Sequence, residues 1–159
     1  MTADRPAPTG SAVSSAPSVT VVTVASADRA GHVARQHEGL DLWAPGARRV
    51  VVQIGETPWP IPGAEIVDRT GPGPVRLGEA RNAGAAAALA HPHGPADSDL
   101  IVFLDADCVP APGLVDVFAA AAAEDPGAIL SGPVTYLAEG TGEVDVVKRN
   151  LADQRAGPG

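Results

Sequence analysis

The chain has 159 residues, the size of one ordinary domain, and a formal net charge of −8. This charge argues against a general nucleic-acid-binding protein, because such proteins hold phosphates with clustered cationic side chains. The single cysteine rules out an internal disulfide, no apolar run approaches the roughly 20 residues that span a bilayer, and no secretory signal opens the chain, so we expect a soluble cytoplasmic protein.

The N-terminal part of the chain changes character near residue 18. Residues 1–17 are rich in Pro, Ser, Ala and Thr without apolar periodicity, which predicts a disordered segment. Residues 18–24 form a β-branched run of mostly Val and Thr, the pattern of a buried strand. Asp28 then follows at a position where it can cap a helix that runs to about Leu40.

Further along, apolar strands alternate with helices. Strands are predicted at residues 49–54, 64–67, 100–104, 128–130 and 133–137, and helices at residues 77–90 and 113–124. Because the strands are continuously apolar and alternate with helices, we expect an α/β fold of Rossmann-like type, a mostly parallel sheet covered by helices on both faces. The domain is predicted to span residues 18–137, with residues 138–159 as a C-terminal tail.

An acidic pair, Asp105 and Asp107, follows the most apolar strand of the chain. In extended backbone, residues two apart project to the same side, so both carboxylates are predicted to face one point. Two anionic oxygen ligands suit Mg²⁺ or Mn²⁺, which completes its shell with water and substrate phosphates. The alternative is that Asp105 caps a loop and Asp107 is only solvated.

A second pattern opens the alanine-rich helix. Its first residues read Leu-Gly-Glu-Ala-Arg-Asn-Ala-Gly, from Leu77 to Gly84. Helix N-termini favour anions, and Arg81 adds a fork-shaped donor that matches a phosphate or a base edge. Gly84 permits close backbone packing. The alternative is a surface Arg81 and a glycine packed under the sheet.

Together the two patterns resemble family 2 glycosyltransferases of the glycosyltransferase A fold. The resemblance rests on Ala-Arg-Asn-Ala-Gly at residues 80–84 and Val-Phe-Leu-Asp-Ala-Asp-Cys-Val-Pro at residues 102–110, and it runs from about residue 18 to residue 137. It implies a nucleotide-sugar-binding domain, in which a divalent Mg²⁺ or Mn²⁺ ion helps to transfer a sugar from a nucleotide-diphosphate donor to an acceptor hydroxyl.

The resemblance also implies roles for individual residues. Asp107 would ligate the metal, and Asp105 would lie beside the metal and the donor ribose and sugar. Arg81 would face the nucleotide, and Ala25 would present its backbone to the base. Gln53 aligns with an acidic pair of the family and would read the base edge by hydrogen bonds.

The family's acceptor half and catalytic base lie well beyond the metal motif. Here that region offers only Glu139, Glu143, Asp145 and Asp153, in no matching motif, so the catalytic base is unassigned and the chain resembles a shortened member. Two alternatives remain open. One is a phosphohydrolase of the haloacid dehalogenase type, with Asp105 as nucleophile; the other is a non-catalytic donor-binding module that needs a partner chain.

Overall fold

The computed structural model describes residues 17–90 and 100–136, and within them four parallel strands form one sheet in the order β3-β2-β1-β4. Apart from Pro17, the segment expected to be disordered lies outside the described residues, as does the predicted tail. The strands are β1 (Val19–Ser26), β2 (Arg48–Ile54), β3 (Glu65–Asp68) and β4 (Leu100–Phe103).

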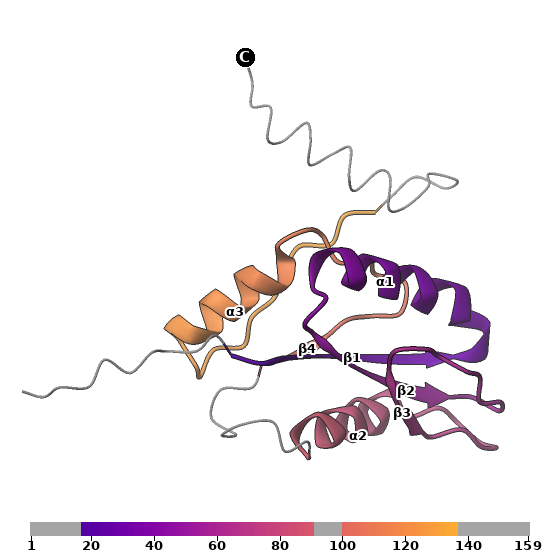
Figure 1. Ribbon diagram of the computed structural model, residues 1–159. Coiled ribbons are helices and arrows are strands. Elements are labelled where there is room, and N and C mark those ends of the chain that lie inside the picture. Colours follow the sequence, from indigo (N-terminus) through magenta and orange to yellow (C-terminus); the bar gives the residue numbers. More distant parts are fainter. Residues whose placement is uncertain (1–16, 91–99, 137–159) are drawn as a thin grey trace, which may run out of the picture.

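Helices cover both faces of this sheet (Figure 1). A short 3₁₀ turn, η1 (Ala27–Arg29), leads from β1 into α1 (Ala30–Trp43). The helices α1 and α3 (Leu114–Glu124) lie on one side of the sheet, and α2 (Leu77–Leu89) lies on the other. The expected α/β fold with a parallel, doubly covered sheet is therefore confirmed.

The central strand β1 explains why the sheet needs both layers. Along this strand Val21 and Ala25 pack toward α1, whereas Val22 between them packs toward α2. All three are at most 2% exposed. Because successive side chains of a strand point to opposite faces, a strand that is apolar at consecutive positions requires cover on both sides.

Two predicted features are wrong in the described residues. Residues 128–136 form no strand, and Ile129 is fully exposed, because an apolar run becomes a strand only where a neighbouring strand offers backbone partners. Asp28 does not cap α1, which has Arg29 at its N-cap without a side-chain hydrogen bond. The Asp28 carboxylate instead accepts a hydrogen bond from the Ser26 hydroxyl, which lowers its pKa.

No helix within residues 17–90 and 100–136 has both the length and the apolar character needed to cross a membrane. This finding agrees with the absence of a long apolar run in the sequence.

Gly84 lets α2 approach the sheet closely. A Cβ placed on Gly84 would lie 2.9 Å from Cγ2 of Val52 and even closer to Cγ1 of Val22, both of which are buried. Real Cβ atoms essentially never come this close to a neighbour. Gly84 is therefore a glycine packed against the sheet, as one of the two interpretations of the sequence predicted.

Replacing Gly84 with alanine is expected to destabilise the protein by about 1–3 kcal/mol, because the new methyl group overpacks a rigid contact. Gly78→Ala is the matched control, since Gly78 lies in the same helix with nothing within 4 Å of an added Cβ. It should be neutral or stabilising by up to about 1 kcal/mol. Chemical denaturation checks both variants, and equal stabilities would contradict the packing argument.

Burial of His37 makes the stability of the fold depend on pH. Burial, followed by the nearby Arg49 guanidinium, lowers the pKa of His37 from its ordinary value of 6.5, and these effects outweigh its hydrogen bond to the Pro62 carbonyl and the nearby Asp41 carboxylate. Below pH 6.5 the unfolded chain therefore binds more protons at this site than the folded chain.

The contribution of neutral His37 to stability is thus fully present above pH 6.5 and is lost as the pH falls through the lower folded pKa. Replacing His37 with Gln should flatten the decline in the free energy of unfolding between pH 6.5 and pH 5. Urea titrations at half-unit pH steps measure this slope. A variant whose slope matches that of the wild-type protein would show that His37 does not cause it.

Candidate active site

A cavity opens where β1, β2 and β4 end. Its volume is about 330 Å³, and it lies at the carboxyl edge of the parallel sheet, where ligands bind in open α/β folds. The 3₁₀ turn η1, through Arg29, and the start of α2 complete its wall. The lining residues are Val24, Ala25, Ser26, Arg29, Ile54, Leu77, Arg81, Asp105, Ala106 and Asp107.

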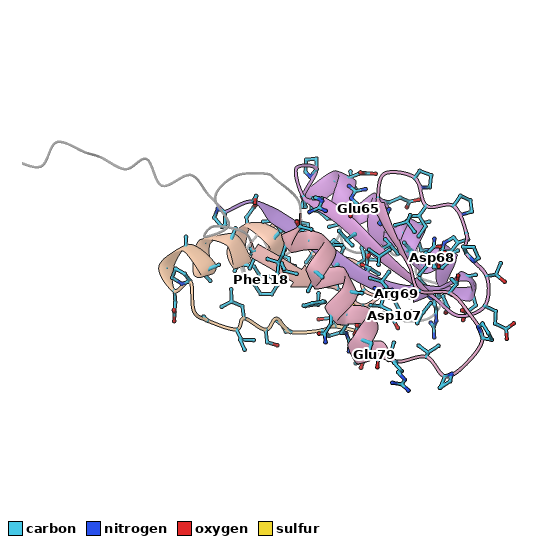
Figure 2. All side chains as sticks on the ribbon, turned by 90° about the horizontal axis from the view of Figure 1, so that it is seen from below. Glu65, Asp68, Arg69, Glu79, Asp107 and Phe118 are labelled. Atoms are coloured by element: carbon cyan, nitrogen blue, oxygen red, sulfur yellow. The ribbon has the colours of Figure 1, made fainter. Side chains whose placement is uncertain are left out.

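Four of the five residues predicted for the site meet in this cavity: Ala25, Arg81, Asp105 and Asp107. They come from the end of β1, from α2 and from the loop after β4. Figure 2 labels Asp107 together with Glu79, a residue of the first turn of α2. The cavity therefore gathers residues that are separated by up to about eighty positions in the sequence.

The backbone of the acidic pair is a turn and not an extended strand. Asp105 and Asp107 follow β4 after Leu104, and the Cys108 amide donates to the Asp105 carbonyl oxygen at 2.9 Å, which closes a four-residue turn. The prediction of extended backbone at this point is wrong, since β4 ends at Phe103. The two carboxylates nevertheless line the same cavity.

The buried side chain of Gln36 anchors this turn by hydrogen bonds. The side-chain amide of Gln36, on α1, donates to the carbonyl oxygens of Asp105 at 2.8 Å and Cys108 at 3.1 Å. Its own oxygen accepts a hydrogen bond of 2.8 Å from the hydroxyl of Thr23 on β1. Neither Gln36 nor Thr23 was predicted from the sequence. The available signals were weak: Thr23 is a polar residue among the valines of β1, and Gln36 is a polar residue beside the apolar face of α1.

The turn also packs directly against α1 through Gly39. A Cβ on Gly39 would meet Cγ1 of Val109 at 2.8 Å and Cδ of Pro110 at 3.1 Å. Pro110 is fully buried in this contact. The absence of a side chain at Gly39 therefore lets the segment after the acidic pair lie close to the helix, within reach of Gln36.

Arg81 forms an ion pair with one carboxylate of the site. Its guanidinium Nη2 lies 3.0 Å from Oδ1 of Asp105, and the two side chains are 47% and 70% exposed. An exposed pair of this kind contributes at most about 1 kcal/mol to stability, so it is easily exchanged for other partners. Together with Arg29 and Asp107, the pair gives the cavity wall two guanidinium groups and two carboxylates.

Gln53 lies apart from these residues. It is 1% exposed, and its side-chain amide donates a hydrogen bond to the Trp59 carbonyl oxygen. It does not line the cavity of the acidic pair. Its predicted role in reading a base edge therefore stays a prediction.

A second and larger cavity, of about 530 Å³, adjoins the first, and Ile54 lines both. It lies between the loop that follows β3 and the start of α2. Its wall carries two arginines, Arg69 and Arg76, and the latter pairs with Glu79 at 2.8 Å. The two cavities together have the size range of small-ligand sites.

The donor set of the acidic pair is compatible with a divalent cation that is only partly held by protein. No group of three or more His, Cys, Asp or Glu residues within the described ranges could hold a metal by itself. Two carboxylates that line one open cavity nevertheless fit the way Mg²⁺ binds, with one or two carboxylates, substrate phosphates and water.

Cys108, beside the acidic pair, is not set up as a nucleophile. Partial burial raises the pKa of its thiol, and the negative charges of Asp107 and Asp105 raise it further. Its sulfur lies 4.0 Å from Oδ1 of Asp107. Because the thiolate is the reactive form, this environment keeps the thiol protonated and unreactive near neutral pH.

Replacing Asp107 with Asn should lower the pKa of Cys108, because it removes a neighbouring negative charge that disfavours the thiolate. At pH 8, in the presence of a chelator, we expect alkylation of this single cysteine to be faster than in the wild-type protein. Iodoacetamide kinetics followed by mass spectrometry measure the rate. Asp116→Asn, an exposed change of the same charge on α3, is the control and should leave the rate unchanged.

The fold and the cavity define an α/β protein of Rossmann-like type with a cavity at the carboxyl edge of the sheet. The family model of glycosyl transferase family 2 matches residues 65–154, more than half of the chain, and the chain belongs to this family. The comparison with curated proteins and the comparison with solved structures gave no match. The family resemblance inferred from residues 80–84 and 102–110 is therefore confirmed.

The matched region contains three of the predicted site residues, Arg81, Asp105 and Asp107. The other wall of the cavity, including Ala25, comes from β1, η1 and the end of β2, which precede the matched region. The structure thus joins the family-matched part and the N-terminal part of the chain in one site.

Proposed function

We propose that this chain binds a nucleotide-diphosphate sugar together with Mg²⁺ or Mn²⁺ and donates the sugar to an acceptor hydroxyl. The observation that supports this most is the convergence of Asp105, Asp107 and Arg81 on one cavity at the carboxyl edge of the sheet. The family is one of glycosyltransferases, and the metal requirement and the residue roles are the parts that we propose.

Asp107 and Asp105 hold the cation, and phosphate oxygens and water provide its remaining ligands. Such a cation neutralises the diphosphate and stabilises it as a leaving group. The two carboxylates need no further protein ligand for this task, since the donor itself completes the coordination. Their 330 Å³ cavity is open to solvent, which leaves room for the diphosphate to enter.

Arg81 orients the donor. In the absence of ligand its guanidinium pairs with Asp105 at a partly exposed position. A diphosphate that enters the cavity offers a stronger, bidentate partner, since guanidinium and phosphate match in geometry. Arg81 then exchanges its contact, and Asp105 is free to turn toward the cation and the sugar.

The nucleoside end of the donor lies toward the end of β1. Ala25 lines the cavity at the end of β1, and its methyl group offers no polar atom, so any hydrogen bond from this residue to the base comes from its backbone. The adjoining cavity beyond Ile54 gives the donor a second compartment with two arginines on its wall. We place the base and ribose between these two regions.

The acceptor site and the catalytic base are contributed from outside the described residues, either by this protein or by a partner chain. The four acidic residues after Leu137, namely Glu139, Glu143, Asp145 and Asp153, lie outside the described part of the structure. Donor binding is therefore the activity that residues 17–136 are proposed to carry, with the predicted domain of residues 18–137 as its unit.

Replacing Asp107 with Ala is expected to weaken Mn²⁺-dependent binding of a UDP- or GDP-sugar by at least about tenfold, or about 1.4 kcal/mol, because one of two anionic ligands is lost. Isothermal titration calorimetry with and without Mn²⁺ measures this. A panel of nucleotide sugars, screened by thermal stabilisation of the wild-type protein, first selects the donor.

Asp116→Ala is the matched control, because it removes the same charge from an exposed position on α3 outside both cavities. It should bind the donor like the wild-type protein. Undiminished affinity in the Asp107→Ala variant, or donor binding of equal strength in a chelator, would count against the metal role.

A further inference from the structure

We propose that Gln36 is a positioning residue of the active site. By anchoring the turn, Gln36 determines where the carboxylates of Asp105 and Asp107 lie in the cavity. It touches neither substrate nor metal and acts through the backbone of the turn. The inference that this position matters for donor binding rests on the proposed function, whereas the anchoring of the turn itself does not.

The hydrogen bonds of Gln36 leave its orientation no freedom. Its amide nitrogen donates to two carbonyl oxygens, those of Asp105 and Cys108, and its oxygen accepts from the Thr23 hydroxyl. A carbonyl oxygen can only accept, so the nitrogen end must face the turn and the oxygen end must face β1. Gln36 is 0% exposed and Thr23 is 2% exposed, so water does not compete for these bonds.

The two anchored carbonyls belong to the first and last residues of the turn. Asp105 opens the turn and Cys108 closes it through its own amide hydrogen bond to Asp105. Fixing both ends limits the orientations of the peptide groups between them and therefore the Cα–Cβ directions from which both carboxylates extend. The turn carries no regular secondary structure that would otherwise set its position.

Packing alone does not require a glutamine at this place. A leucine of similar size would fill the same space between α1 and the sheet, but it would leave the Cys108 carbonyl oxygen and the Thr23 hydroxyl without their Gln36 partner, and the Asp105 carbonyl oxygen with only the Cys108 amide. The desolvation cost of burying the Gln36 amide is offset because the turn provides two hydrogen-bond acceptors for its nitrogen. The polar pair Thr23 and Gln36 is thus explained by the turn that it holds.

The test uses the full chain and two independent measurements. Cys108 is the only cysteine, and it closes the turn, so its alkylation rate without any ligand reports how firmly the turn is held. Calorimetry with Mn²⁺ and the UDP- or GDP-sugar selected on the wild-type protein reports donor binding. Gln36→Leu should raise the alkylation rate and weaken the donor at least about tenfold each.

A control separates positioning from general loss of stability. Val50 is 0% exposed and packs on the α2 face of the sheet, on the opposite side from Gln36. Val50→Ala should lower stability while leaving alkylation and donor binding at wild-type values, when both variants are measured at a temperature where they stay folded. Equal effects of the two variants on both measurements would overturn the inference.

A double variant makes the distinction sharper. Adding Thr23→Val to Gln36→Leu removes the hydroxyl that the single variant leaves without a partner, so part of the lost stability should return. The turn carbonyls still lack their donor, so alkylation should stay fast. A double variant that regains both stability and slow alkylation would show that Gln36 has only a packing role.

The outcomes also distinguish this inference from the proposed function. If the wild-type protein binds no nucleotide sugar with Mn²⁺, the proposed function fails, and the alkylation rates still decide whether Gln36 anchors the turn. If the wild-type protein binds the donor and a folded Gln36→Leu variant binds it equally well, the inference fails. Should Gln36→Leu not fold, Thr23→Val alone should loosen the turn to a smaller extent, and an unchanged alkylation rate would refute the anchoring.

Discussion

The site depends on one buried side chain amide that ties three parts of the chain together. Gln36 links α1 to β1 through Thr23 and to the turn after β4 through two backbone carbonyls. The partners in the turn are 69 and 72 positions away in the sequence. Besides this link, the segment of the acidic pair is held by the exposed ion pair of Asp105 with Arg81 and by the packing of Val109 and Pro110 against α1.

Periodicity in the sequence predicts the layers of the fold but not the contacts between distant segments. In the described residues, the four paired strands and the α-helices lie within a few residues of their predicted bounds, because local apolar patterns and the Pro and Gly residues between them mark each element. The strands expected within residues 128–137 do not form in the described part, since pairing is a tertiary property. The role of Gln36 could not be predicted from the sequence, because it also depends on tertiary contacts. Its burial depends on carbonyl groups from a turn about seventy residues away, and no local pattern encodes them.

In the candidate site, too, the sequence predicts the position of residues but not their tertiary contacts. Asp105, Asp107 and Arg81 were predictable because strand ends and helix starts meet at the carboxyl edge of a parallel sheet. The family resemblance selected Gln53 near the end of β2, but its side chain is buried and donates a hydrogen bond to the Trp59 carbonyl oxygen. Edge position predicts which residues approach a site, whereas the direction of a side chain depends on what the neighbouring loop offers it.

The anchorage of the turn has a consequence for how this active site tolerates change. Gln36 holds carbonyl oxygens, which every amino acid possesses, and no side chain of the turn takes part in its bonds. Gln36 therefore holds the backbone of the turn whatever side chains stand at the exposed positions 105 and 107. Substitutions at these positions, from carboxylates to amides or imidazoles, can therefore change the chemistry at the carboxyl edge of the sheet while the backbone of the turn keeps its position.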